Sequence, residues 1–201
     1  MPDTGAPWNI PYVASTDLVS DWPADSLALA NAIDAGLDAA GGLVAVKHAL
    51  FTGTQTNSTA QGADFAVTDL SITHTLANSA NKLIIMATLG LAANGDNRGG
   101  VGIKMLDGST LIGGGAAAGN RTPVTVANAR LSGTGDSDVG AAVTATFVYE
   151  PGDTASHTYA LHASNTTTST QTIYINRPEG DQDQPYTARA ASSLVMMEVK
   201  V

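Results

Sequence analysis

The strongest constraint on the fold is an alternation of apolar and polar residues that runs from residue 43 to residue 201. In residues 143–149, for example, Val, Ala, Phe and Tyr occupy every second position, with Thr144 and Thr146 among the residues between them. A period of two is that of a β-strand with one buried face. We therefore expect strands at Val44–Phe51, Phe65–Leu76, Lys82–Leu91, Val101–Leu106, Thr122–Leu131, Ala141–Glu150, Ser156–Ser164, Gln171–Asn176 and Ser192–Val201.

Turn-forming residues separate these segments, as in Asn94-Gly95-Asp96-Asn97, Asp107-Gly108 and Pro151-Gly152-Asp153. Many short strands without a helix among them predict an antiparallel sandwich or barrel. The expected fold class is mainly β, with eight to ten strands, and two sheets of four or five strands each would make a jelly roll. Met86, Met105, Met196 and Met197 are expected in its core.

Residues 1–42 follow a different pattern, so we place a domain boundary near Gly41-Gly42. The chain is predicted to consist of an N-terminal anchoring arm and helix, residues 1–42, and a jelly-roll domain, residues 43–201. Three prolines within residues 1–20 forbid a continuous helix and favour an extended arm. Residues 21–40 read as one helix, because Asp21 can cap its start and apolar residues recur every three or four positions.

Large apolar side chains on the arm and the helix are the candidate anchors. The arm folds back onto its own domain or docks on another protein, and the second alternative is preferred because exposed aromatic groups are unfavourable in water. The helix packs on the domain behind it or joins a short trimeric bundle, and both alternatives stay open. The predicted partner-anchoring residues are Trp8, Ile10, Tyr12, Val13, Trp22, Leu27, Ile33 and Leu37.

Composition excludes several classes of protein. The 201 residues carry a net charge of −9, which disfavours nucleic acid as a partner, and the absence of Cys excludes disulfides and thiolate zinc sites. No apolar run reaches the ~18 residues of a membrane span, and residues 1–4 do not resemble a secretory signal. Charged residues make up 13% of the chain, against about 25% in typical globular domains. A surface so poor in charge suits close packing against copies of the same chain.

No motif of known chemistry is present, so we expect a non-enzymatic protein without a cofactor or a metal ion. The four histidines show no metal-binding spacing, and neither a Gly-x-Ser-x-Gly motif nor a phosphate-binding loop occurs. The carboxylate pairs Asp136/Asp138 and Asp181/Asp183 lie among polar loop residues, where solvation explains them. A charged cluster before the last strand is expected to form local ion pairs or an inter-subunit network; its members are Arg177, Glu179, Asp181, Asp183 and Arg189.

Two stretches resemble proteins of tailed-bacteriophage particles. Residues 9–38 follow the pattern of an N-terminal arm, "PY…STDLV…WP", followed by a small Ala/Leu helix. Residues 142–199 contain in order "ATFVYEPG", "HTYALHAS", "TIYINRPEGD" and "ASSLVMMEV", which is similar to the C-terminal half of trimeric jelly-roll domains on phage particles. The resemblance implies a homotrimer with a TNF/C1q-like jelly roll on the virion surface, anchored by its N-terminal arm and assembled in the cytoplasm of a bacterial host.

The resemblance leaves the place on the particle open. A helix of under 20 residues links arm to domain, which favours a site close to the attachment surface, as for a capsid decoration or cement protein on the major capsid protein. The alternative is a tail fibre or tail-tip protein, attached to a tail protein, that recognises a host surface glycan or protein. Its contacts would come from loops at residues 94–100, 113–120 and 165–170.

Overall fold

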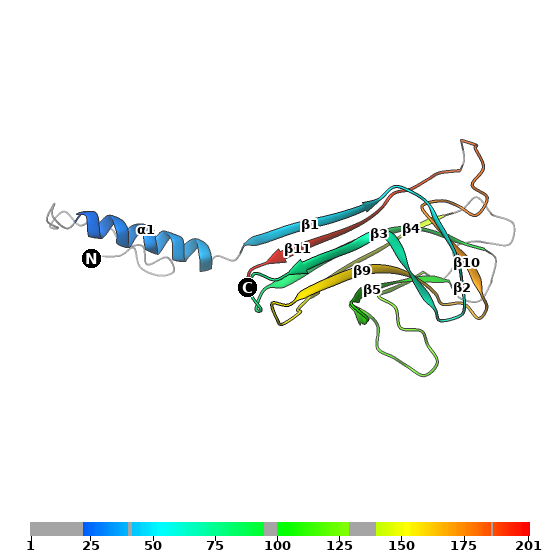
Figure 1. Ribbon diagram of the computed structural model, residues 1–201, viewed down its shortest axis with the longest axis horizontal. Coiled ribbons are helices and arrows are strands. Elements are labelled where there is room, and N and C mark those ends of the chain that lie inside the picture. Colours follow the sequence, from blue (N-terminus) through cyan, green and yellow to red (C-terminus); the bar gives the residue numbers. More distant parts are fainter. Residues whose placement is uncertain (1–21, 40–41, 95–99, 129–139, 186) are drawn as a thin grey trace. The chain divides into compact units, whose positions relative to one another are not determined.

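The computed structural model describes residues 22–39, 42–94, 100–128, 140–185 and 187–201. The chain divides into two compact units, residues 1–43 with Val201, and residues 44–200. In the described part of the first unit, helix α1 spans Trp22–Ala39, as the sequence predicts (Figure 1). Asp21 and the arm, residues 1–20, lie outside the described residues. The roles predicted for residues 1–42 and 43–201 stay predictions.

The second unit is built of strands that form two antiparallel sheets. The first sheet has the order β1–β11–β4–β10–β2, with β8 also paired to β4, and the second has the order β3–β9–β5–β6, with β7 also paired to β5. The strands of the described residues are β1 (Leu43–Phe51), β2 (Gln55–Thr59), β3 (Asp64–Thr75), β4 (Lys82–Ala93), β5 (Val101–Asp107), β6 (Thr110–Ile112), β7 (Val126–Asn128), β8 (Ala141–Tyr149), β9 (Ser156–Asn165), β10 (Gln171–Ile175) and β11 (Ser192–Val199).

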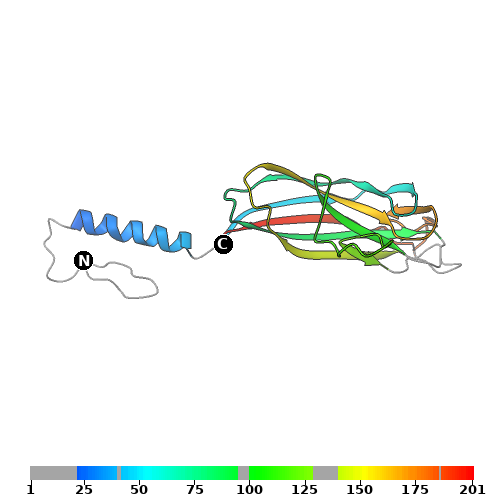
Figure 2. The same cartoon turned by 90° about the horizontal axis from the view of Figure 1, so that it is seen from below.

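The chain crosses repeatedly between the two sheets, which makes the unit a jelly-roll sandwich. It passes from β3 in the second sheet to β4 in the first, back to β5, on to β8 and back again to β9. The first and last strands of this unit are neighbours in the first sheet, where β11 runs beside β1 (Figures 1 and 2). The predicted fold class, a mainly β antiparallel jelly-roll sandwich, is confirmed.

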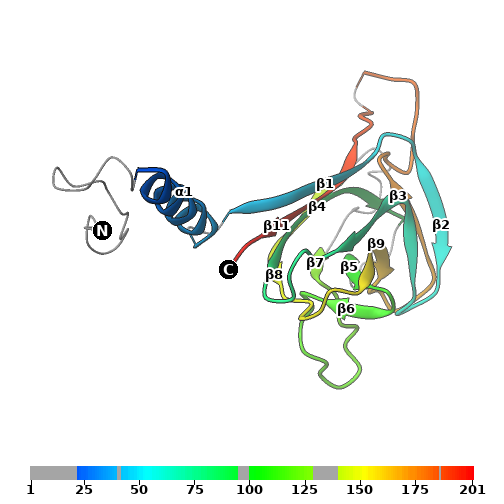
Figure 3. The ribbon, with the colours of Figure 1, turned by 60° about the vertical axis from the view of Figure 1, so that its left-hand side comes forward.

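The core lies between the two sheets and is supplied by every second residue of most strands. Leu83, Ile85 and Leu89 of β4 are fully buried, as are Ile103 and Met105 of β5. Inward residues of β9 and β11 complete the layer; these are Tyr159, Leu161, Ala163, Leu194 and Met196. The view along the strands shows β1, β11 and β4 facing β3, β9 and β5 across this core (Figure 3).

The sequence prediction is wrong in three details. The described residues contain eleven strands rather than eight to ten, because the sequence pattern does not predict β2 and β6. Strand β2 is wholly polar and β6 has three residues, so neither shows an apolar alternation. The expected strand Thr122–Leu131 is reduced, within the described residues, to β7. Its first residues instead cross the outer face of β5, where Val124 packs over Gly102.

Candidate functional site

The outer face of the first sheet is apolar, although this sheet already buries an apolar inner face. Along β4, Ile84 and Met86 alternate with buried residues and point outward, half-buried. Val195 and Met197 do the same along β11. An antiparallel sheet with one face in water normally carries polar residues on that face. Strands β4 and β11 depart from this rule, because they carry apolar residues on both faces of the sheet.

Cross-strand register joins these residues into rows. Met197 of β11 pairs with Ile84 of β4, which pairs with Val148 of β8. In the next row Val195 pairs with Met86. Residues directly opposite on one face of a sheet are in contact range, so the first row is an apolar strip across three strands. The second row is apolar on β11 and β4 and ends at Thr146 on β8.

Strand β1 extends the apolar surface at the edge beside β11. Ala49 and Phe51 pack against the core, so the residues of opposite parity face outward. Val44, Val46 and Leu50 are 43%, 55% and 50% exposed, and Val148 on β8 is 58% exposed. We call the outward residues of β1, β11, β4 and β8 the assembly face; the apolar ones are Val44, Val46, Leu50, Ile84, Met86, Val148, Val195, Met197 and Val199.

Charge is sparse on the assembly face. Among the outward residues of its four strands, within the described part of the chain, Lys82 is the single Lys, Arg, Asp or Glu. It lies at the start of β4 and its Nζ is 2.7 Å from Oε1 of Glu150. Apolar surfaces of this kind are typical of protein or membrane contacts and of ligand grooves.

The outer face of the second sheet is polar instead. The hydroxyls of Thr73 on β3 and Thr158 on β9 are 3.0 Å apart and exposed. Further along, the Lys104 ammonium donates to Asp64 Oδ2 at 2.6 Å, and His162 Nδ1 lies 2.8 Å from Asp64 Oδ1. Burial alone would raise the pKa of Asp64, but the hydrogen bonds from Lys104 and His162, with the charge of Lys104, bring it below its usual value.

A buried carboxylate ties the two sheets together at one end of the sandwich. Glu198 of β11 is 1% exposed and accepts hydrogen bonds from Ala77 N at 2.8 Å and Asn81 Nδ2 at 2.6 Å. His74 Nε2 of β3 lies 2.8 Å from its second oxygen. Burial would raise the pKa of Glu198, yet these hydrogen bonds lower it, so the carboxylate stays ionised inside the protein.

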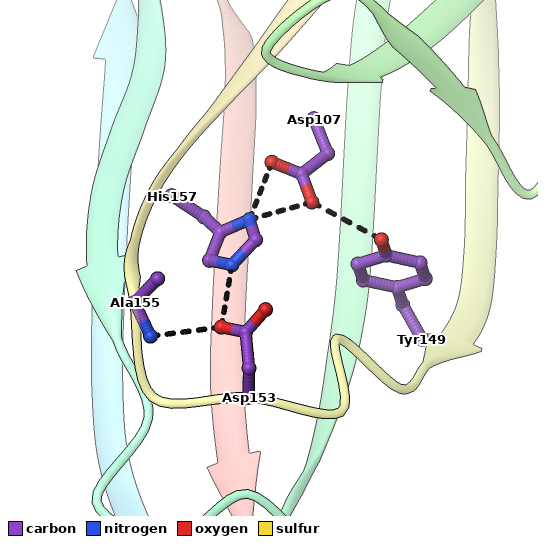
Figure 4. A network of polar contacts seen from close by, with 5 residues as sticks. All are labelled: Asp107, Tyr149, Asp153, Ala155 and His157. Carbon is purple, nitrogen blue, oxygen red and sulfur yellow. Dashed lines mark hydrogen bonds and ion pairs between the residues drawn. The ribbon is translucent and has the colours of Figure 1, made fainter.

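A second polar network fixes the β8–β9 loop to the end of β5 (Figure 4). His157 Nδ1 lies 2.8 Å from the carboxylate of Asp107, and its Nε2 lies 2.9 Å from Asp153 Oδ1. Tyr149 donates to Asp107 Oδ2 at 3.1 Å, and Ala155 N donates to Asp153. Hydrogen bonds to Asp153 and to Asp107 raise the pKa of His157 above its usual value.

The residues predicted to anchor a partner are placed only in part. Leu27 and Ile33 lie on α1 and are 62% and 45% exposed. The side chains of Trp22 and Leu37, also on α1, are not described. Trp8, Ile10, Tyr12 and Val13 lie outside the described residues. The exposure of two helix residues leaves the anchoring role a prediction.

The other candidates from the sequence have local explanations where they are described. Asp181 forms ion pairs with Arg177 at 3.3 Å and Arg189 at 2.9 Å within the chain, as the local interpretation of this cluster predicts. Residues 95–99 and the pair Asp136/Asp138 lie outside the described residues. The described part contains no group of three residues that could hold a metal ion. Nor does it contain a helix long and apolar enough to cross a membrane.

Sequence reasoning missed the assembly face. Met105 and Met196 belong to the core as expected, but Met86 and Met197 face outward, so the prediction for these two is wrong. The sequence does carry a signal for this face. Residues 83–87 and 194–197 are apolar at both odd and even positions, which is unusual for a strand with one solvated face.

Comparison with known proteins identifies no family. No family model and no curated protein matches the chain. Among solved structures, it is similar to those of infectious bursal disease virus Gt strain and Gx strain, with 10% and 12% identity and TM-scores of 0.39 and 0.35. The alignments cover 77% and 78% of this chain but 40% and 39% of those chains, so the chain spans about two fifths of their length. A likeness at these TM-scores supports no statement about assembly or partners.

Proposed function

We propose that this chain is a non-enzymatic structural protein of a bacteriophage virion, a homotrimer held together by the assembly face. In this proposal residues 1–42 attach the trimer to another virion protein. The major capsid protein is the preferred partner, which makes the chain a capsid decoration or cement protein. The observation that carries the proposal is the apolar outer face of the β1–β11–β4–β8 sheet.

A second and third copy of the chain are the occupants that best fit this face. The face is close to neutral, so a partner of strong charge would gain no electrostatic complementarity from it. Identical neutral surfaces meet without like-charge repulsion, and closed symmetric assemblies of one chain are the common form of soluble oligomer. Three copies, rather than two, follow from the resemblance of residues 142–199 to trimeric jelly-roll domains.

The attachment role of residues 1–42 is supported by charge and exposure. Residues 1–40 carry six acidic residues and no Lys or Arg, whereas the remaining residues carry twelve acidic and nine basic ones. Leu27 and Ile33 expose apolar side chains on α1. A partner surface that is basic and partly apolar would match both features.

Localisation on the particle tests the proposal. Cryo-electron microscopy of phage that carries this protein should show it at regular positions on the capsid exterior. Density at the tail tip alone would contradict the decoration role and support the alternative, a receptor-binding tail protein. A variant that lacks residues 1–20 should still form the trimer but fail to join particles, while Arg189→Gln, a change in an exposed ion pair, should join normally. Full occupancy by the truncated protein would overturn the attachment role.

A further inference from the structure

The polar outer face of the second sheet contains a pocket that the assembly role does not use. It lies on the side of the sandwich opposite the assembly face and has a volume of about 550 Å³. Ligand sites usually measure about 300–1,000 Å³. Its polar lining comes from Asp64, Lys104, His162 and Ser109, and its apolar lining from Leu106, Leu111 and Pro123.

Three strands fix the polar group of the pocket. Lys104 of β5 and His162 of β9 are directly opposite in the sheet register, and Asp64 lies on the neighbouring strand β3, two residues from the partner of His162. The carboxylate of Asp64 lies 2.6 Å from Lys104 Nζ and 2.8 Å from His162 Nδ1. The side chains of Asp64, Lys104 and His162 are 14–25% exposed. Packing therefore restrains their positions, while part of each side chain stays accessible to solvent.

The apolar wall is held in place by the segment between β6 and β7, which leaves the sandwich beside β5 (Figures 1 and 3). Thr125 N donates to Ile103 O at 2.8 Å and Gly115 N donates to Val124 O at 3.1 Å. Val124 packs directly over Gly102, which leaves room for it because glycine has no side chain. A Cβ at position 102 would lie 2.8 Å from Val124 Cγ1. Pro123 is thereby fixed at the rim of the pocket beside Leu111.

Charge restricts the class of ligand. The charges of Lys104 and Asp64 neutralise each other, so this ion pair gives the pocket no net positive charge to attract a phosphate or a sulfate. The protein as a whole carries a net charge of −9, which also disfavours an anionic ligand. A metal ion would have one carboxylate, already held by an ammonium at 2.6 Å. A neutral ligand rich in hydroxyl groups fits a pocket with these properties.

We infer that this pocket binds one residue of a neutral saccharide. The Lys104 ammonium carries three donors, of which Asp64 accepts one, and the carboxylate of Asp64 keeps lone pairs that can accept further hydrogen bonds. Neighbouring sugar hydroxyls can donate to Asp64 and accept from Lys104. The C–H face of the ring can pack against Leu106, Leu111 and Pro123. Direct hydrogen bonds to paired charges with an apolar platform give a site its orientation and specificity.

Saturation-transfer NMR on the full-length protein tests the inference. The probes are glucose, galactose, mannose, rhamnose and N-acetylglucosamine, each at millimolar concentration, with inorganic phosphate and a neutral hexapeptide as comparisons. At least one sugar should give a saturable signal, and Asp64→Asn or Lys104→Met should weaken its binding at least ~10-fold. Asp181→Asn is the matched control, because Asp181 is also a partly exposed carboxylate between two basic groups, and it should leave binding unchanged.

Several results would overturn the inference: no signal from any of the five sugars, a sugar signal that Asp64→Asn leaves intact, or binding of phosphate or the peptide instead. Circular dichroism of each variant separates lost binding from lost folding. If Asp64→Asn fails to fold, Ser109→Trp, which fills the pocket from an exposed turn, should abolish binding in its place. The oligomeric mass is measured on the same samples. A monomer that binds sugar would contradict the proposed assembly and leave the saccharide site standing.

Discussion

The outer faces of the two sheets differ more than any other pair of surfaces in the jelly roll. The first carries Ile84, Met86, Val195 and Met197 in rows. At its margin lies Lys82, the one charged residue among the described outward positions of β1, β11, β4 and β8. The second carries a threonine pair and the Asp64–Lys104–His162 group. Both faces belong to strands of one sandwich, so the difference does not arise from the fold. The proposed assembly rests on the apolar face, and the proposed saccharide site rests on the polar one.

The largest effect should come from a charge placed in the middle of the assembly face. Ile84→Asp puts a carboxylate between Met197 and Val148, where assembly would bury it without a partner. We expect the trimer to dissociate, with a loss of about 3 kcal/mol or more per contact, at least ~100-fold in affinity. Sedimentation velocity measures the change.

Thr158→Asp is the control for this comparison, because it places the same charge within β9 on the other outer face, where Thr158 is exposed. It should leave the mass unchanged. If both variants dissociate, or neither does, the two faces do not differ in the way described.

The next effect tests the polar contacts buried between the two faces. Glu198→Gln replaces an acceptor by an amide N–H that faces the donors Ala77 N, Asn81 Nδ2 or His74. We expect the free energy of unfolding to fall by about 1–3 kcal/mol in urea denaturation. Glu150→Gln, at a carboxylate that is 65% exposed, should change it by less than about 0.5 kcal/mol. Equal losses in the two variants would show that burial of Glu198 contributes nothing.

A smaller, pH-dependent effect should come from the His157 network. The pKa of His157 is raised above 6.5, so its stabilisation is complete below that pH and is lost as the pH rises through the folded-state pKa. The pKa of Asp153 is lowered below 3.8, so its share is lost only as the pH falls through that lower value. The melting temperature of His157→Asn should therefore lie furthest below the wild type between about pH 4 and 6.5, and the difference should shrink as the pH rises above that range. A constant difference across this range would contradict the assignment.

The smallest effect is expected at the margin of the assembly face. Lys82→Met removes an ion pair whose two side chains are 36% and 65% exposed, and adds apolar area beside Ile84. The free energy of unfolding should change by no more than about 0.5 kcal/mol, and the trimer should persist. Dissociation of this variant would show that the ion pair, rather than the apolar rows, holds the assembly.

The sequence predicts the fold well because most strands show, within their own residues, the apolar–polar alternation that identifies a buried face. The alternation in residues 143–149 places Val143 and Ala145 inside, and both are buried. The turns that follow β5 and β8 were also identified from Asp107-Gly108 and Pro151-Gly152-Asp153. Strand β2 could not be found in this way, because its polar residues are held by pairing with β10 rather than by an apolar face.

The candidate sites were harder to predict because they depend on residues far apart in the sequence. Asp64, Lys104 and His162 come from three strands, and only the sheet register makes them neighbours. Glu198 gave no sign of burial in the sequence, since its donors lie more than a hundred residues away. The assembly face was recognisable in principle from the apolar residues at both parities of β4 and β11.

The mass of the full-length protein in solution tests the central claim most directly. Light scattering coupled to gel filtration, at micromolar concentration and neutral pH, should give three times the chain mass of 20.3 kDa, with no change on dilution across that range. A particle of one chain mass would show that the assembly face stays in water and would contradict the account. A dimer would keep the face as an interface but contradict the threefold assembly.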